Sequence, residues 1–329
     1  MDTNENAVKP NYGEVDEAWL ARIQQLRAET DSQRRLIHLS NFEAFVAVHH
    51  AEDWSEVKSW LALPGNWVYR GQHEATWFLT TSLERAITKT LTIPQIGLDS
   101  ISGPARMDPA QNETKLLQEF QRRAHHYIKA VPEASEILDW LALMQHYGAP
   151  TRLLDWTLSP YVALYFAIER PSSGSEHAVW AIESNWLEAA TRTILQEPFF
   201  PFNLRDRCEK INRTIFSGTN PNIVILANPF RMNERLAAQQ GVFLTNLSHY
   251  DFTISLLEMI APLDKPVVRK LVVSPSARLG LLRELQRMNI TGASLFPGLD
   301  GFSQSLKVNL ELELDALTRR IATNGREVY

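Results

Sequence analysis

Two short stretches of the sequence gather side chains that bind anions or move protons. The first is Tyr69-Arg70-Gly71-Gln72, in which an arginine follows a β-forming run and precedes a glycine. A guanidinium at the end of a buried strand is costly unless an anion meets it, and its planar shape suits bidentate binding of phosphate or carboxylate. The pattern therefore predicts that these four residues contact a ligand. The alternative is that Arg70 pairs with a structural aspartate.

A second stretch, residues 146–160, is more polar than a connection between two predicted helices normally is. It holds five side chains that could contact a ligand, namely His146, Arg152, Asp155, Thr157 and Ser159. Packed polar groups need partners in the protein or in a ligand, and the helix expected after Ser159 offers free backbone N–H groups to an anion. We therefore predict Arg152, Asp155 and His146 as catalytic residues and the two hydroxyls as ligand contacts. The alternative is a rigid loop in which Arg152 pairs with Asp155 while Ser159 only caps the helix.

A third stretch, residues 233–243, is predicted to form a turn of helix, a glycine and then a strand. The side-chain amide of Gln239 or Gln240 could reach the edge of a base or ribose. A surface amide at a helix end would give the same pattern. We take Gln239 as a candidate ligand contact.

Common catalytic and metal-binding motifs are absent from the sequence. No P-loop, Gly-x-Gly-x-x-Gly, Gly-x-Ser-x-Gly or His-Glu-x-x-His pattern occurs, which removes the usual nucleotide hydrolases, Rossmann enzymes, hydrolases and zincins. The histidines at 49–50 and 125–126 are adjacent, so they point to different faces of a helix and cannot chelate together. His146 and Asp155 lack any recognised ligand spacing. We predict no metal.

The composition is that of an ordinary globular protein. The chain has 329 residues, of which 44% are hydrophobic and 22% charged, and its net charge of −5 gives no overall field that would draw it to nucleic acid or an anionic membrane. A local basic pocket is compatible with this charge. The single cysteine, the lack of an export signal and the absence of a long apolar run predict a cytoplasmic protein without a membrane contact.

We expect one domain with short extensions. The polar residues 1–16 are expected to form a disordered lead, residues 17–39 an N-terminal helix, residues 40–320 a single domain and residues 321–329 a tail. Within the domain, residues 91–107 are rich in Gly, Pro, Ser and Thr and are predicted to be a flexible loop.

The hydrophobic periodicity changes along the chain. It predicts helices over residues 42–51, 54–63, 112–131, 132–148 and 278–288, and a buried helix from Pro160. In the helix over 112–131, Leu116 is expected to face the core. Ser82 is expected to cap the helix that carries Arg85. Strands are expected over 67–69, 178–182, 222–226, 242–246 and 267–273, and the first of them should end before Arg70. Residues 295–304, which contain Gly and Pro, are expected to form an irregular segment. The fold class is therefore mixed α+β, with a helical N-terminal part packed on a mainly antiparallel sheet.

Several of these segments together resemble the FRG domain, a family named for an aromatic-Arg-Gly element. The matching segments are Tyr69-Arg70-Gly71-Gln72 with Trp77, Leu79, Ser82, Leu83 and Arg85; residues 146–156 running into Ser159-Pro160 and 163–167; Glu234-Arg235 with Gln239, Gly241 and Phe243; and residues 295–301. The resemblance covers roughly residues 40–305, with tyrosine in place of phenylalanine at the position that names the family.

A second, superfamily-level resemblance is to ADP-ribosyltransferases, through aromatic-Arg-Gly on a first strand and a hydroxyl before an Ala-x-x-Phe-Ala helix. It implies an ADP-ribosyltransferase-like fold, NAD as the cofactor, Arg70 holding a phosphate or ribose, and Thr157 or Ser159 supporting the nicotinamide-ribose pocket. The acidic residue expected on a later strand is replaced by Gln239 and Gln240. Asp155 is our own hypothesis for the missing charge.

Three functions therefore stay open. The chain is an NAD-using enzyme that modifies a protein target, or a non-catalytic module that binds a nucleotide or a nucleic-acid end. In either case it could serve as a bacterial toxin or phage-defence effector. All three predict a small anionic or nucleotide ligand, and the net charge does not indicate a nucleic-acid partner.

Overall fold

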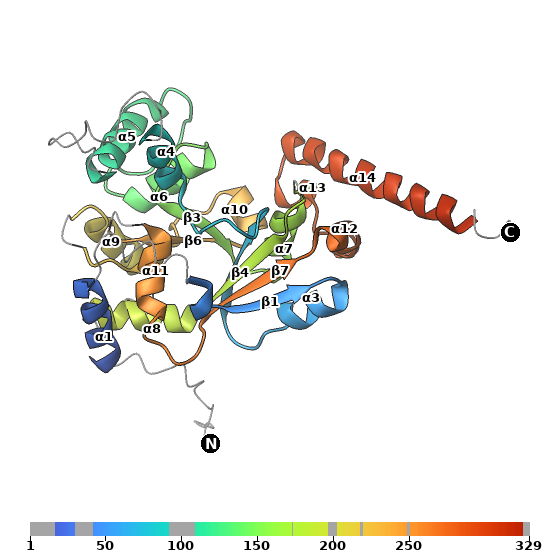
Figure 1. Ribbon diagram of the computed structural model, residues 1–329. Helices are drawn as coiled ribbons and strands as arrows, with labels where there is room; N and C mark the ends of the chain where they lie inside the picture. The colour runs from blue at the N-terminus through green and yellow to red at the C-terminus, as the bar shows by residue number, and fades with distance from the viewer. Residues whose placement is uncertain are drawn as a thin grey trace, which may run out of the picture.

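The computed structural model describes residues 17–29, 42–91, 109–172, 174–196, 203–217, 220–248 and 251–324 (Figure 1). The predicted disordered lead, the flexible loop after residue 91 and the end of the predicted tail lie outside these ranges, as do residues 30–39 of the predicted N-terminal helix. None of the helices in the described ranges is long and apolar enough to cross a membrane.

A seven-stranded sheet runs through the described residues. Its strands are β1 (Ala47–Ala51), β2 (Trp67–Gln72), β3 (Leu153–Thr157), β4 (His177–Glu183), β5 (Val224–Leu226), β6 (Gly241–Asn246) and β7 (Val268–Val273). Their order is β1-β7-β4-β2-β3-β6-β5, and every neighbouring pair is antiparallel except β1 with β7. The mixed fold class with a mainly antiparallel sheet is therefore confirmed.

Helices cover both faces of this sheet (Figure 1). They are α1 (Glu17–Glu29), η1 (Phe42–Phe45), α3 (Trp54–Leu61), α4 (Ser82–Leu91), α5 (Pro109–Ala124), α6 (Ile137–His146), α7 (Pro160–Ile168), α8 (Ser184–Ile194), α9 (Leu204–Thr214), α10 (Glu234–Ala238), α11 (Phe252–Ile260), η3 (Pro275–Ala277), α12 (Arg278–Arg287), α13 (Gly292–Leu295) and α14 (Leu299–Asn324). One apolar core joins α7, α3 and α12 to the sheet, and another joins α6, α8 and α11 to it.

The alternation of side chains along β2 divides its residues between these two cores. Tyr69 lies opposite Ala181 in the α7 core, whereas Val68 lies opposite Ile182 in the other core. Successive side chains of a strand point to opposite faces, so Gly71 shares the face of Tyr69 and Arg70 shares the face of Val68. The strand continues to Gln72, so the prediction that it ends before Arg70 was wrong.

Two other predictions of local structure were wrong because long-range pairing overrides local pattern. The predicted helix over residues 42–51 is the short turn η1 followed by strand β1, which pairs with β7. The polar stretch that was expected to be a loop contains strand β3, whose Leu154 and Trp156 are buried and which lies between β2 and β6.

Helix boundaries also differ from the sequence prediction. Thr81 caps α4 in place of Ser82, because its Oγ1 accepts the N–H of Glu84 while the Glu84 carboxylate accepts the N–H of Thr81. Leu116 is 40% exposed, whereas it was expected to face the core. The segment 295–304, which was predicted to be irregular, contains the start of the 26-residue helix α14.

Ser159 caps α7 as predicted, since its Oγ accepts the N–H of Val162. The strands predicted over 178–182, 222–226, 242–246 and 267–273 correspond to β4, β5, β6 and β7. Three of them, β4, β6 and β7, lie inside the sheet, and β5 forms one of its edges.

Gly71 allows the backbone of β2 to touch α7. A Cβ at this position would lie 2.1 Å from the carbonyl oxygen of Ala163 and 2.5 Å from the amide nitrogen of Ala167. Both of those atoms belong to helix backbone, which cannot move aside as a flexible side chain can. We therefore expect Gly71→Ala to lower the free energy of unfolding by about 1–3 kcal/mol, measured by urea denaturation.

The matched control for Gly71→Ala is Gly280→Ala in α12, where an added Cβ meets nothing within 4 Å. Because alanine favours a helix over glycine, this variant should gain up to about 1 kcal/mol. Equal stability of Gly71→Ala and the unmodified protein would show that the contact with α7 can relax.

Candidate functional site

The Tyr69-Arg70-Gly71-Gln72 element is mostly built into the fold. Tyr69 is buried at an edge-to-face contact with Trp60, with ring centroids 6.3 Å apart, and burial raises its pKa to about 12. Gln72 is buried as well, and its Oε1 accepts the indole N–H of Trp180 at 2.7 Å. Of the two polar side chains that flank Gly71, Gln72 is engaged by hydrogen bonds within the fold, whereas Arg70 keeps free hydrogen-bonding capacity.

The Arg70 side chain is partly buried and incompletely partnered. Its Nη1 donates to the backbone oxygen of Asp155 at 2.6 Å, whereas its Nε is buried without a hydrogen-bond partner among the described residues. Burial lowers the pKa of Arg70 to about 10; the Asp155 carboxylate opposes this shift and the Arg85 cation adds to it. The side chain therefore stays positive at neutral pH, and it forms no ion pair with a described carboxylate. Its buried Nε–H can therefore donate to one more hydrogen-bond acceptor.

Asp155 supplies an exposed carboxylate beside Arg70. Its Oδ2 accepts a hydrogen bond from Gln145 Nε2 at 3.0 Å, and Gln145 Oε1 in turn accepts from the Thr151 hydroxyl at 2.5 Å. The Thr151 N–H donates to Ser82 Oγ at 2.9 Å, which connects the network to the start of α4. The first and second polar stretches therefore meet at Arg70 and Asp155, and Gln145 holds the carboxylate in place.

Arg152 is directed away from this site and into the protein. Its Nε lies 3.0 and 2.8 Å from the two carboxylate oxygens of Glu113 on α5, and its Nη2 also contacts that carboxylate. Arg152 is 5% exposed and Glu113 0%. Arg152 Nη1 reaches three backbone oxygens, those of Ile215, Asn246 and Leu247. The Arg152–Asp155 pair considered from the sequence is thus replaced by a buried pair with Glu113.

The second and third polar stretches are joined by hydrogen bonds. The Thr157 hydroxyl donates to the backbone oxygen of Gln239 at 2.7 Å and accepts the N–H of Ser159 at 3.0 Å. The Leu158 N–H donates to the backbone oxygen of Gln240, which has a left-handed φ of 47°. These bonds fix the entry to α7 and give Thr157 and Ser159 a role in the fold.

The remaining predicted residues lie around the same junction. The Gln239 side chain donates from Nε2 to the backbone oxygen of Leu295 at 3.0 Å. Burial and the nearby Arg235 cation lower the pKa of His146, so its ring is neutral at pH 7. Arg235 itself stacks on Phe296, with its guanidinium carbon 4.7 Å from the ring centroid. A neutral imidazole can accept or donate a proton, whereas the Gln239 amide is already engaged.

Two aromatic side chains near the site were not singled out as ligand contacts from the sequence. Trp77 is 53% exposed and Phe78 50% exposed. Their loop is held by a hydrogen bond from Gln72 Nε2 to the Phe78 oxygen at 3.1 Å and by one from Arg85 to the Thr80 oxygen at 2.5 Å. The signal available in the sequence was the closeness of an aromatic pair to Arg70. Nothing local marked Gln145 as the partner of Asp155.

The donor set around Arg70 does not suit a metal ion. In the ranges that the structure covers, no three His, Cys, Asp or Glu side chains are grouped closely enough to hold one. A cation next to Arg70 and Arg85 would also be repelled. The arrangement favours an anionic ligand.

The family model of the FRG domain matches residues 65–176, which extend from the turn before β2 to the turn before β4. The match includes Arg70, Arg85, His146 and Asp155. No curated protein and no solved structure matches the chain. The predicted single domain over 40–320 extends beyond the matched residues and stays a prediction.

Breaking the Arg152–Glu113 pair should be strongly destabilising. Arg152→Met leaves the Glu113 carboxylate buried without its partner, which typically costs about 3–5 kcal/mol. Urea unfolding followed by circular dichroism measures the loss. Arg123→Met is the matched control, because it removes an exposed pair with Glu119 and should change stability by less than about 1 kcal/mol. Similar losses in both variants would contradict a special role for the buried pair.

The Glu84 carboxyl should make stability depend on pH. Burial raises its pKa to about 7 against the hydrogen bond from the Thr81 N–H, with the Asp251 carboxylate adding to the rise. Between its ordinary value and about 7 the folded protein binds more protons than the unfolded chain. The stabilisation contributed by protonated Glu84 is therefore present at low pH and is lost as the pH rises through 7.

The test compares the unmodified protein with Glu84→Gln by urea denaturation at pH 5 and pH 8. When the pH is raised from 5 to 8, Glu84→Gln should become more stable relative to the unmodified protein by a few kcal/mol (on the order of 3). Glu119→Gln controls for the loss of an exposed carboxylate. A difference that is the same at both pH values would show that Glu84 titrates as it does in the unfolded chain.

Proposed function

We propose that this chain, whose residues 65–176 form an FRG domain, binds a small phosphate-bearing ligand with Arg70 as its anion anchor. The observation that carries the proposal is the partly buried guanidinium, whose Nε is buried without a hydrogen-bond partner and which has one hydrogen bond to a backbone oxygen and no carboxylate ion pair among the described residues. A phosphate oxygen bound to this guanidinium would supply the missing acceptor and the missing negative charge.

A nucleotide is the class of ligand that the surroundings favour. Trp77 and Phe78 offer exposed aromatic faces in a loop whose position is set by Gln72 and Arg85. Aromatic faces stack on nucleobases, and the two arginines supply positive charge for phosphates. Inorganic phosphate alone would leave the aromatic side chains without a role.

NAD is the nucleotide that the superfamily resemblance suggests, and the residues present fit it in part. Arg70 can hold a phosphate, and the exposed Asp155 carboxylate beside it could stabilise positive charge that develops on the ribose. His146 is neutral and available for proton transfer. These residues support an ADP-ribosyltransferase-like reaction that transfers to a protein target.

A non-catalytic nucleotide-binding module is favoured by one observation. Gln239 and Gln240 stand where the superfamily carries a late acidic residue, and the Gln239 amide is bonded to the Leu295 oxygen. This amide supplies no negative charge. Asp155 would then only help to position the ligand.

Arg70→Ala should weaken binding of the phosphate-bearing ligand. Isothermal titration with NAD, ADP-ribose, AMP and pyrophosphate measures the affinity, and we expect a loss of at least about tenfold for whichever of these binds. Arg70→Lys keeps the charge but not the bidentate geometry, so it should bind with intermediate affinity. Arg123→Ala, which removes an exposed arginine on α5, is the control and should bind normally. Unchanged affinity in Arg70→Ala would refute the anchor.

Turnover separates the enzyme from the module. The unmodified protein is incubated with labelled NAD and a cell lysate, and both nicotinamide release and label transfer are followed. Loss of turnover in Asp155→Asn, with binding retained, would support the enzyme. Binding of NAD without turnover in the unmodified protein would support the module.

A further inference from the structure

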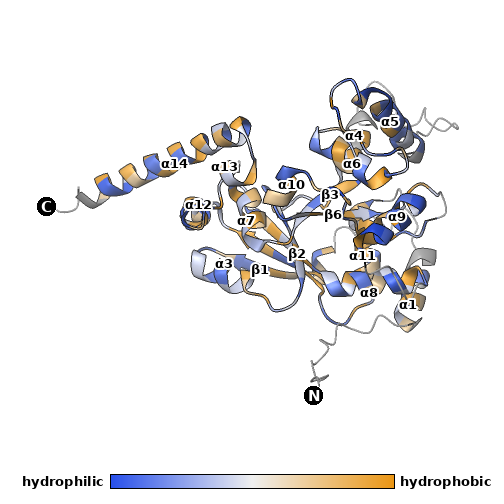
Figure 2. Cartoon of the chain, turned by 180° about the vertical axis from the view of Figure 1, so that it is seen from behind, coloured by the Kyte–Doolittle hydropathy of each residue, from blue (hydrophilic) through white to orange (hydrophobic). Residues whose placement is uncertain are grey.

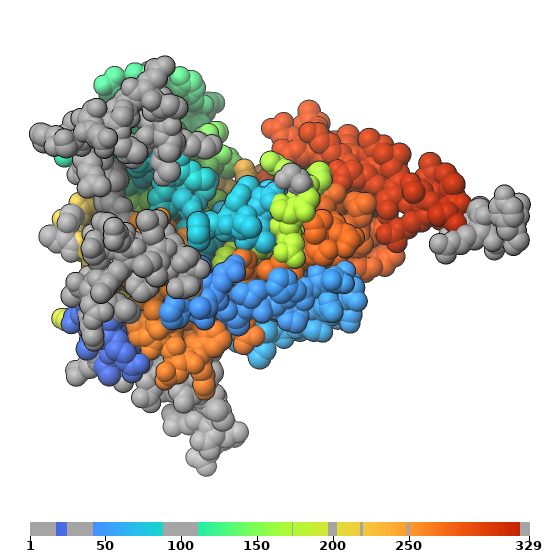
Figure 3. Space-filling model, viewed as in Figure 1, coloured from blue at the N-terminus to red at the C-terminus, as the bar shows by residue number. Residues whose placement is uncertain are grey.

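The last helix, α14, presents a continuous apolar stripe to solvent. The seven side chains of this stripe each expose half or more of their surface: Leu299, Phe302, Leu306, Leu310, Leu314, Leu317 and Ile321. They recur at intervals of three or four residues, which places them on one face of the helix. Figure 2 shows apolar residues along the whole helix, and in Figures 1 and 3 the helix forms a projecting end of the molecule.

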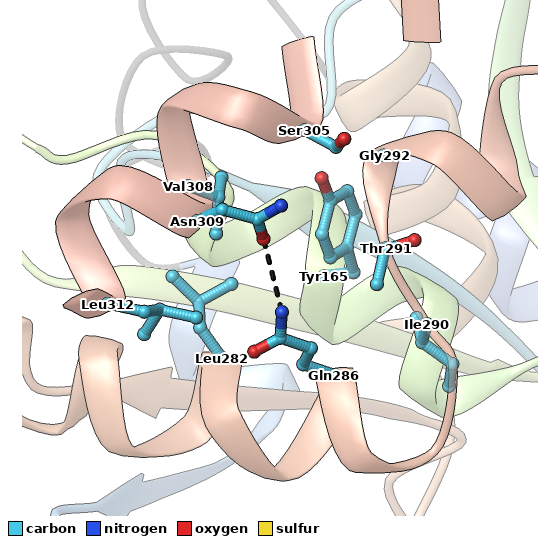
Figure 4. Close-up of a pocket in the computed structure, with 10 residues that line it drawn as sticks. All are labelled: Tyr165, Leu282, Gln286, Ile290, Thr291, Gly292, Ser305, Val308, Asn309 and Leu312. Atoms are coloured by element: carbon cyan, nitrogen blue, oxygen red, sulfur yellow. Dashed lines mark hydrogen bonds between the residues drawn. The ribbon is translucent and has the colours of Figure 1, made fainter. Parts of the chain in front are cut away.

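The opposite face of α14 is seated on α12, which fixes the direction in which the stripe points. Asn309 accepts a hydrogen bond from Gln286 at 3.1 Å, and Val308 and Leu312 line a small cavity with Leu282 (Figure 4). That cavity has a volume of about 10 Å³, room for one water molecule. Arg278 and Arg283 of α12 also pair with acidic side chains of α14. The helix is therefore held in place, and its outer stripe has no cover among the described residues.

The stripe is large enough for a stable interface. Seven large side chains, each at least half exposed, offer on the order of 700 Å² of apolar surface, close to the roughly 800 Å² per partner that a standard interface buries. This area exceeds the patch of about 300–600 Å² that a typical monomer exposes. The stripe therefore matches the size of one face of a dimer.

We propose that two copies of this chain pair through α14, with the helices antiparallel and the two-fold axis at Leu310. The stripe is nearly symmetric about that residue, since Leu306 and Leu314 lie four positions away on either side and Leu299 and Ile321 lie eleven. The remaining pair, Phe302 and Leu317, lies eight positions before and seven positions after it. Antiparallel pairing therefore sets apolar side chains of one copy at the level of apolar side chains of the other. A two-fold interface requires this kind of self-complementary surface.

The charges beside the stripe favour the antiparallel arrangement over the parallel one. About Leu310, the level of Glu313 in one helix is that of Lys307 in the other, and the level of Arg320 is that of Asp300. All four of these side chains are exposed. A parallel pair would instead place each charge at the level of its own copy, where like charges repel.

The first test is the oligomeric state of the full chain. Sedimentation velocity over a range of concentrations should show a dimer for the unmodified protein and a monomer for Leu310→Asp, because a buried unpaired charge opposes association. Leu116→Asp, a matched change at an exposed leucine on α5, should stay dimeric. A monomer at every concentration for the unmodified protein would overturn the proposal and assign the stripe to a different partner. A dimer that persists in Leu310→Asp would also overturn it.

The second test fixes the direction of the helices by disulfide trapping. Leu299→Cys and Ile321→Cys proteins are oxidised separately and as a mixture. Antiparallel pairing predicts cross-linking in the mixture alone, whereas parallel pairing predicts that each variant cross-links to itself. The native Cys208 is buried, and burial raises its pKa to about 11, so its thiol does not compete. Self-linking of each variant would refute the antiparallel pair.

Discussion

The structure around the site depends on one buried ion pair, that of Arg152 with Glu113. Two charges removed from water are tolerated only when each is fully met by the other and by further hydrogen bonds. Here the guanidinium binds the Glu113 carboxylate and three backbone oxygens from the ends of α9 and β6. The pair thereby joins α5 and α9 to the residue that precedes β3. It fixes the start of that strand, and with it the position of Asp155.

The alternation of side chains along β2 places the residues of the Tyr69-Arg70-Gly71-Gln72 motif on two different faces of the sheet. Along β2, Tyr69 and Gly71 face α7, where a bulky ring and a missing side chain serve packing. Arg70 and Gln72 point to the other face, and the Gln72 amide is hydrogen-bonded to Trp180 and to the Phe78 backbone. The motif is therefore mainly structural in its residue types. Its arginine is the member that we propose contacts a ligand.

How much of this could be predicted from the sequence depends on whether the stabilising contacts are local. The later strands were visible as apolar β-branched runs because both of their faces are buried. Strand β1 exposes His49 and His50 and is held by pairing with β7, more than two hundred residues away, so no local pattern marks it. The length of α14 was missed because apolar residues lie on both its inner and outer faces, which hides the helical period.

The same distinction holds for the candidate site. The importance of Arg70 and Asp155 followed from residue type and neighbours, and the structure places them side by side. The partner of Arg152 could not be predicted, because Glu113 lies 39 positions earlier and in a different helix. The nearby position of Asp155 in the sequence suggested it as the partner instead. Only the folded structure distinguishes the carboxylate of Asp155 from that of Glu113.

The glycine in β2 has a mechanical consequence. With no side chain between them, the strand backbone and α7 are in direct contact, and close-packed interiors transmit displacement instead of absorbing it. At its other side, α7 carries Tyr165, whose ring lines the cavity shared by α12 and α14 (Figure 4). The strand that bears Arg70 and the helix at the far end of the molecule are thus joined by continuous packing through α7.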